Sequence, residues 1–177
     1  MILVDILAGI ILVLSFLGGL KEGAVKQFFS LMALIIAILI AGLYYRLIAT
    51  ILSFLPGENW ENFIGFFIAL ALVSVILHLI FLIPRKITQK VWGKGALFRL
   101  LGGGLNALNA SIGMVMFTLT LLAYPIFDWL ERAVGNSSVL AWLVKNLSFV
   151  QTMLPEIFQK ATTPIVADQL FKMIFPM

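Results

Sequence analysis

The sequence predicts an all-α integral membrane protein, in which a bundle of four transmembrane helices is followed by amphipathic surface helices. Hydrophobic residues make up 62% of the 177 residues and charged residues only 11%, with a mean hydropathy of +1.12. Soluble domains, by contrast, are about 45–50% apolar and about 25% charged. Four apolar runs approach or exceed the roughly 18 residues that predict a membrane span, and charged residues gather between them.

The first two spans are expected at residues 2–20 and 28–45. The first run starts directly after the initiator Met without a basic region, and no Ala-x-Ala-like site follows it, so we expect a retained helix and not a signal peptide. Charged residues between Lys21 and Lys26 separate the two runs, and Arg46 ends the second.

The third and fourth spans are expected at residues 63–83 and 100–124. Pro84 should stop the third span, because its ring removes a backbone donor and disfavours helix at the preceding residue. Pro125 closes the fourth span. Together the four spans form the predicted membrane domain, residues 1–125.

The connector at residues 84–99 is strongly basic. Its cationic residues are Arg85, Lys86, Lys90, Lys94 and Arg99. The lysines lie at i, i+4 and i+8, a spacing that suits a short interfacial helix, although two glycines favour a solvated loop equally well. In either form, we expect this connector to contact anionic lipid headgroups.

Residues 126–177 differ from the rest of the chain, because charged residues divide them into apolar stretches that are short for a span. Breaks at residues 136–138, at Pro155 and at residues 163–164 predict two or three amphipathic helices along the membrane surface. A fifth span is the less favoured interpretation.

The distribution of Lys and Arg predicts the orientation, since short cytoplasmic connectors carry the excess of basic residues. The connector at residues 84–99 holds five of them, and the first turn holds Lys21 and Lys26, whereas the turn between spans two and three holds mainly Arg46. We therefore expect the N-terminus and the tail on the outer face.

Each of the four runs carries small residues four apart, a spacing that lets helix backbones approach closely in lipid. The rows are Ser15, Gly19 and Gly23; Ala33, Ala37 and Ala41; Gly65 and Ala69; and Gly103, Ala107 and Ser111. A compact bundle is therefore expected.

Four polar residues within the spans are candidates for function. Asn106 and Asn109 share one face of the fourth span, where they act either as a polar lining for permeation or as hydrogen-bonding glue between helices. His78 is either a relay or gating group or a structural residue. Asp5 is shallow enough to reach headgroups or the terminal amine.

Several classes of activity have no sequence signal here. The chain has no cysteine, so a disulfide framework, a thiolate nucleophile and a Cys-based metal site are excluded. It also lacks a phosphate-binding loop, a His-rich metal pattern and a nucleophile-elbow sequence. We therefore expect neither an enzyme nor a bound cofactor or metal, and no nucleic-acid partner, because the net charge of +4 resides mainly in the connector beside the bilayer.

Short motifs spread over the first two-thirds of the chain carry a family resemblance. They comprise an Asp just inside the first span, glycines and basic residues at the first turn, Ser30-Leu31 at the start of span two, and an Arg-Leu-Leu-Gly sequence opening span four. The matching positions are Asp5, Gly19, Gly23, Lys26, Arg99 and Gly102. In these residues the chain resembles the colicin V production protein (CvpA) family, small four-span proteins of the bacterial inner membrane.

The resemblance implies a role in toxin production or secretion and in envelope integrity, without an established reaction. Two functions are then open: a membrane scaffold or complex component, with protein partners or further copies of itself, and a small channel or transporter lined by Asn106, Asn109 and His78. Because the second span has no polar residue between Ser30 and Tyr44, the scaffold is favoured.

Overall fold

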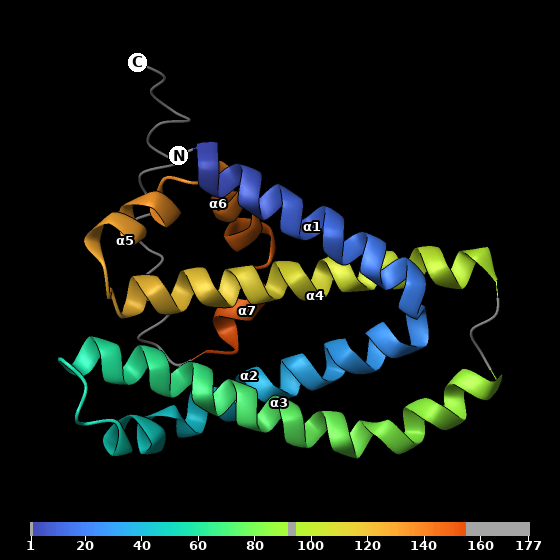
Figure 1. Cartoon of the computed structure of the whole chain (residues 1–177), viewed down its shortest axis with the longest axis horizontal. Coiled ribbons are helices and arrows are strands. Elements are labelled where there is room, and N and C mark those ends of the chain that lie inside the picture. Colours follow the sequence, from blue (N-terminus) through green and yellow to red (C-terminus); the bar gives the residue numbers. More distant parts are fainter. Residues whose placement is uncertain (1, 92–94, 155–177) are drawn as a thin grey trace.

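The computed structural model describes residues 2–91 and 95–154, with residues 89–91 described through their backbone alone. Its ordered elements in these ranges are helices (Figure 1). They are α1 (Ile2–Glu22), α2 (Ala24–Ile51), α3 (Glu58–Val91), α4 (Ala96–Ala123), α5 (Asp128–Gly135), α6 (Ser138–Asn146) and α7 (Ser148–Thr152). The four long helices are apolar enough to cross a membrane, so the predicted four-span helical class is confirmed.

The helices extend beyond the expected spans, most clearly in α3. This helix runs through Pro84 to Val91, so the expectation that Pro84 ends the third span was wrong. Inside hydrocarbon the neighbouring backbone groups still need partners within the helix, so losing one donor costs less than unwinding the turn. Thr88 Oγ1 also donates to the Pro84 carbonyl at 2.8 Å. The first half of the basic connector is therefore the end of α3.

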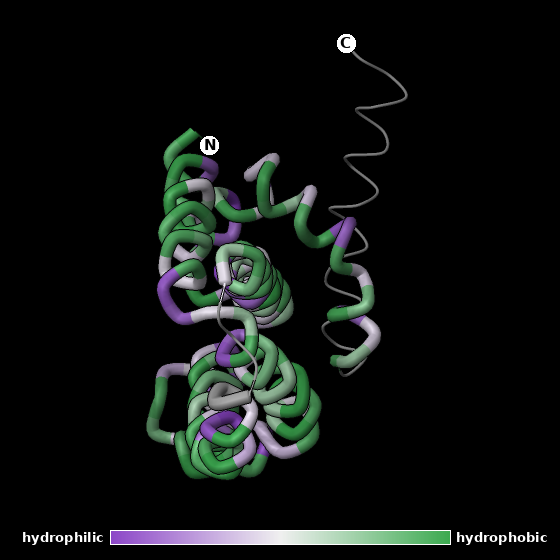
Figure 2. The backbone as a smooth tube through the Cα atoms, turned by 90° about the vertical axis from the view of Figure 1, so that its right-hand side faces the viewer, coloured by the Kyte–Doolittle hydropathy of each residue, from purple (hydrophilic) through white to green (hydrophobic). Residues whose placement is uncertain are grey.

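The long helices pack as two pairs, α1 against α4 and α2 against α3 (Figure 1). Contacts between α2 and α4 join the pairs, whereas α1 with α2, and α3 with α4, touch far less. Gly23, at a φ of +81° between α1 and α2, lets the chain reverse there. Figure 2, which looks along the long axis of the molecule, shows that most of the helical backbone is coloured as hydrophobic, as lipid contact requires.

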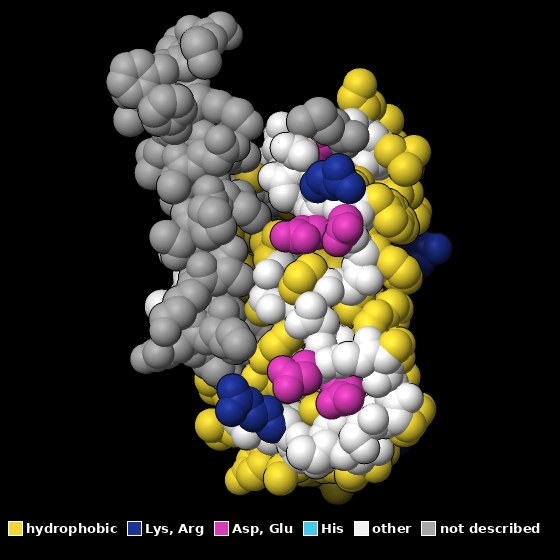
Figure 3. Space-filling view, turned by 90° about the vertical axis from the view of Figure 1, so that its left-hand side faces the viewer, with side chains coloured by type: hydrophobic (Ala, Val, Ile, Leu, Met, Phe, Trp, Pro, Cys, Tyr) yellow, Lys and Arg dark blue, Asp and Glu magenta, His cyan; other side chains and the backbone are white. Residues whose placement is uncertain are grey.

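The two ends of the bundle differ in charge. The N-terminal end holds the chain's start, the α2–α3 connection and α5, and acidic side chains gather on it (Figure 3). They include Glu58 and Glu61 in the first turn of α3, and Asp128 and Glu131 in the first turn of α5. The opposite end, which we call the connector end, holds the Gly23 turn, the basic end of α3 and the start of α4 with Arg99.

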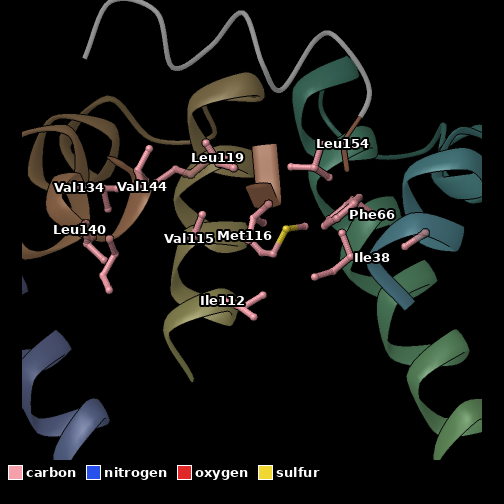
Figure 4. Packing of buried hydrophobic residues seen from close by; sticks show 14 of the residues in the cluster. Ile38, Phe66, Ile112, Val115, Met116, Leu119, Val134, Leu140, Val144 and Leu154 are labelled. Carbon is pink, nitrogen blue, oxygen red and sulfur yellow. The ribbon is translucent and has the colours of Figure 1, made fainter. Parts of the chain in front are cut away.

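α4 lies at the centre of the hydrophobic core. Figure 4 shows side chains of α4 between Ile38 and Phe66 on one side and Val134, Leu140 and Val144 on the other. The expected short helices after residue 125 are present as α5 to α7, and α6 buries one face against α1 and α4. The core therefore continues past the expected domain boundary. Residues 155–177 of the expected tail, with the break at Pro155, lie outside the described residues.

The rows of small residues on all four long helices lie at contacts between helices. Ala33, Ala37 and Ala41 are all buried on α2. A Cβ atom on Gly65 of α3 would lie 3.0 Å from the backbone nitrogen of Ala49 in α2. The row on α1 meets α4, where the candidate site begins.

Candidate functional site

The crossing of α1 and α4 is the closest approach of two helices that the described glycines reveal. A Cβ atom added to Gly102 would lie 2.6 Å from the Gly19 carbonyl oxygen and from the Gly23 carbonyl carbon. One added to Gly19 would collide with the Gly102 carbonyl oxygen. No side chain fits at these contacts, because the neighbouring atoms belong to backbone that cannot rotate away. Gly19 and Gly102, which the sequence singled out separately, therefore face each other at the same helix crossing.

The three successive glycines of α4 have different surroundings. Gly102 meets backbone, whereas a Cβ atom on Gly103 would lie 2.9 Å from a ring carbon of Phe16 and 3.0 Å from Leu20 Cδ2, which are movable side-chain atoms. Nothing lies within 4 Å of the corresponding position on Gly104. The close approach expected for this run is thus strongest at Gly102.

Asn106 lies one turn beyond Gly102 and holds the same crossing. Its Nδ2 donates to the backbone carbonyl oxygen of Ser15 in α1 at 2.6 Å. A side-chain amide in hydrocarbon needs such a partner, and backbone approach at Gly19 brings the carbonyl within reach. The contact is the one that the interpretation of Asn106 as interhelical glue predicts.

Asn109 has no such partner among the described residues. Its Oδ1 is buried without a hydrogen bond there, as is Oγ1 of Thr118 further along α4. A buried acceptor left unpaired costs about 1–3 kcal/mol, and buried polar groups of this kind commonly hold an ordered water. The Oδ1 atom of Asn109 can therefore accept a hydrogen bond from a water or another group in this part of the bundle.

Asp5 joins α1 to α6 at the N-terminal end. Its Oδ1 accepts hydrogen bonds from Ser137 Oγ at 2.5 Å and from the Val139 backbone N–H at 3.0 Å. Ser137 is fully buried and also caps α6, because its Oγ accepts from the Leu140 N–H. The carboxylate thus sits where a helix N-terminus favours an anion. We call Asp5 with Ser137 and Val139 the clasp.

The clasp was not predicted from the sequence. Asp5 was expected to reach headgroups or the terminal amine, and the bonds of its Oδ1 to the start of α6 were not foreseen. The Asn-Ser-Ser break at residues 136–138 did contain a signal for Ser137, since Ser before an apolar run is a common helix N-cap. Sequence spacing alone gave no reason to connect that cap to Asp5.

His78 lies away from the two asparagines. It is exposed on α3, which packs mainly against α2 and touches α4 only slightly. No hydrogen bond to His78 is found within the described part of the chain. The three residues expected to line a channel are therefore not brought together by the described helices.

The first turn and the basic connector lie at the connector end. Glu22 forms an ion pair with Lys26 and accepts a hydrogen bond from Nε2 of the buried Gln27 at 2.6 Å. Lys86 and Arg99 are exposed and Arg85 is half-buried. The side chains of Lys90 and Lys94 lie outside the described residues. The described cations remain available to headgroups.

A second polar cluster, which the sequence did not reveal, closes the N-terminal end. The hydroxyls of Tyr45 and Tyr124 are 2.7 Å apart and buried, and Arg46 Nε donates to Tyr45. Asn59 Nδ2 donates to the Pro125 carbonyl at 3.1 Å. These bonds tie the ends of α2 and α4 to the start of α3. Among the described residues no three His, Cys, Asp or Glu side chains are grouped to hold a metal ion.

Comparison with known proteins places these features in context. The family described as "Colicin V production protein" matches residues 4–148. The protein described as "Uncharacterized transmembrane protein YshB", from Bacillus subtilis (strain 168), is 26% identical over 176 residues, covering 88% of this chain and 97% of that protein. No solved structure matches the chain.

Proposed function

The chain belongs to the colicin V production protein family, and we propose from this that it serves toxin production or secretion and envelope integrity in the bacterial inner membrane. In this proposal it acts as a membrane scaffold or complex component and catalyses no reaction. Its partners are other membrane or envelope proteins, together with anionic lipids at the basic connector.

The contact between Asn106 and Ser15 carries the scaffold proposal. A permeation path needs polar groups that face a continuous space, whereas Asn106 is used to hold two helices whose backbones touch at Gly19 and Gly102. The clasp similarly uses Asp5 to hold α6 on the bundle. Polar groups used in this way give a rigid framework on which other proteins can assemble.

The orientation proposed for this scaffold places the connector end in the cytoplasm. Lys21, Lys26, Lys86 and Arg99 lie at that end, and cytoplasmic connectors carry the excess of basic residues. The acidic N-terminal end, with the clasp and α5 to α7, then faces outward. Exposed Trp129 and Trp142 on α5 and α6 suit the membrane interface, where amphipathic rings concentrate.

Cysteine labelling tests this orientation directly, because the chain has no cysteine of its own. Lys86→Cys and Ser138→Cys place one thiol on each end, at residues that are both exposed. A membrane-impermeant reagent should label only Ser138→Cys in intact cells, and both variants after lysis. Labelling of Lys86→Cys without lysis would reverse the proposed orientation.

Complementation combined with flux measurement tests the scaffold itself. A strain lacking the protein should regain envelope integrity with wild-type protein and also with the double variant Asn106→Leu, Asn109→Leu, because a scaffold needs no polar path. Neither protein should pass ions or small solutes in reconstituted liposomes. Flux through the wild-type protein that the double variant loses, together with failed complementation, would overturn the scaffold.

A small channel is the second candidate, and the buried, unpaired Oδ1 of Asn109 favours it. An amide oxygen without a protein partner is the kind of group that binds a passing water or solute in a membrane path. Under this alternative, Asn109→Leu alone abolishes liposome flux, while Asn136→Leu at an exposed position outside the spans leaves it unchanged. Absence of flux from the wild-type protein would rule the channel out.

A further inference from the structure

The connector half of α3 exposes large apolar side chains. Leu79, Ile80 and Ile83 are 58–69% exposed there, and lipid tails cover such side chains without cost. An apolar face of this kind alone says nothing about a partner. His78 is different, because it is a polar side chain exposed among these aliphatic ones.

The depth of His78 makes its exposure costly. Glu61 and Arg85, which bracket the apolar part of α3, are about 36 Å apart along the axis at 1.5 Å per residue. His78 lies about 10 Å inward from Arg85 on the same basis, within a hydrocarbon layer about 30 Å thick. An imidazole has no long flexible stem with which to reach the interface, as Lys and Arg do. Its polar nitrogens therefore need a partner at this depth.

The face of α3 that carries His78 also has room for another helix. Ser74 and Ala71 lie one and two turns from His78 on that face, and small residues there allow close helix approach. Beyond them the face continues into a hollow of about 380 Å³ between α3 and α4. It is lined by Phe63, Ile64, Phe67, Ile68, Ala71 and Phe117. The slight contact of α3 with α4 leaves this hollow open to the bilayer.

We propose that this face of α3 is a self-association surface, on which α3 of a second copy of the chain packs in a symmetric dimer. Copies inserted with one topology are related by a twofold axis along the membrane normal, so residues at equal depth meet. His78 then meets His78 of the second copy. A neutral imidazole carries one donor and one acceptor, so one ring can donate to the other, and this hydrogen bond pairs one nitrogen of each ring.

This dimer is independent of the proposed scaffold role, because a scaffold can work as a monomer and a dimer can serve a channel equally. The same geometry explains why a second copy is favoured over an unrelated helix. A symmetric pair supplies the complementary His at the required depth without any additional protein. Ala71 of each copy, further outward, lets the two helices approach closely.

Disulfide crosslinking in native membranes tests the surface, with single cysteines introduced into the cysteine-free chain. Ala71→Cys lies on the proposed face, and Ile76→Cys is a control on the opposite side of α3, about 8 Å closer to the connector end. Oxidation should give a disulfide-linked dimer with Ala71→Cys and little with Ile76→Cys. Equal crosslinking of both, or of neither, would overturn the proposal, and so would a crosslink of Ala71→Cys to a different protein.

Replacement of His78 tests its part in the dimer. His78→Leu keeps the bulk but removes both hydrogen-bonding nitrogens, and its exposed position predicts an unchanged melting curve of the monomer in detergent. The association constant, measured by energy transfer between labelled copies in liposomes, should fall about three- to tenfold. Ile76→Asn introduces a polar residue on the control side of α3 and leaves the proposed face intact. The association constant of this variant should equal that of the wild-type protein. Unaltered association of His78→Leu would refute the role of the imidazole.

Discussion

The two helix pairs of the bundle are held in different ways. α1 meets α4 where the backbones of two glycines touch. α1 is also held by two hydrogen bonds, one from Asn106 of α4 to the Ser15 carbonyl and one from Ser137 to Asp5. α2 meets α3 at a looser backbone approach, where Gly65 faces the backbone of Ala49, and through buried Tyr45, which packs edge-on against Phe66. Small residues four apart mark both pairs in the sequence. The comparison shows that the same spacing of small residues marks both a helix crossing with no room for a Cβ atom and a crossing that almost admits one.

The largest effect is expected at the backbone contact. Gly102→Ala places a Cβ atom 2.6 Å from backbone that cannot rotate away, so α1 and α4 must separate. We expect destabilisation at the upper end of the roughly 1–3 kcal/mol typical of overpacking, measured by thermal unfolding in detergent. Gly104→Ala is the matched control, with nothing within 4 Å, and should stabilise α4 by about 0.5–1 kcal/mol. If Gly102→Ala and Gly104→Ala unfold at the same temperature, the backbone contact between α1 and α4 is not tight, and the two helix pairs do not differ in this respect.

Loss of the clasp should be next in size. Asp5→Ala removes a charged acceptor from Ser137 and Val139, and hydrogen bonds to charged groups contribute about 1.5–3 kcal/mol. The clasp holds α6 and not the α1–α4 crossing. The rate of protease cleavage near Ser138 should therefore rise clearly, while the unfolding temperature of the whole protein changes less. Asp5→Asn, which keeps an acceptor oxygen, should recover part of the protection. Unchanged proteolysis of the Ala variant would show that α6 is held by its apolar face alone.

The approach of α2 and α3 at Gly65 is looser, so a substitution there should cost less. A Cβ atom on Gly65 would lie 3.0–3.2 Å from the backbone nitrogen, Cα and Cβ atoms of Ala49, so the two helices need to move apart by only a few tenths of an ångström. Gly65→Ala is therefore expected to cost about 1 kcal/mol, the lower end of the overpacking range, in the same unfolding measurement. A loss as large as that of Gly102→Ala would mean that the second pair is as rigid as the first.

The smallest effect is expected from the amide at the crossing. Asn106→Leu removes the hydrogen bond to Ser15, and such bonds average about 0.6 kcal/mol in membrane proteins. The glycine contact should survive, so the protein remains folded with a slightly lowered unfolding temperature. Complete unfolding of Asn106→Leu would show that the hydrogen bond, and not the backbone contact, stabilises the α1–α4 pair.

Much of the fold was predictable because the bilayer imposes simple rules. Apolar runs long enough to span hydrocarbon located all four helices, and breaks after residue 125 located the short ones. Pro84 was misjudged, since the rule that proline ends a helix comes from water, where the released backbone groups find other partners. The candidate site was predictable as a set of residues, including Asp5, Gly102 and Asn106. Their partners were not, because Ser137 and Ser15 are far from them in sequence.

By itself the sequence determined the membrane class, the four spans, the charge difference between their ends and the family. All of these depend on hydropathy, charge or motifs that are local in the chain. Only the tertiary structure decided that α1 pairs with α4, that Asp5 holds α6, and that His78 faces outward from α3. Hydrocarbon solvates every apolar face equally, so hydropathy cannot select one helix pairing over another. Backbone fit and the few polar groups that need partners make that choice.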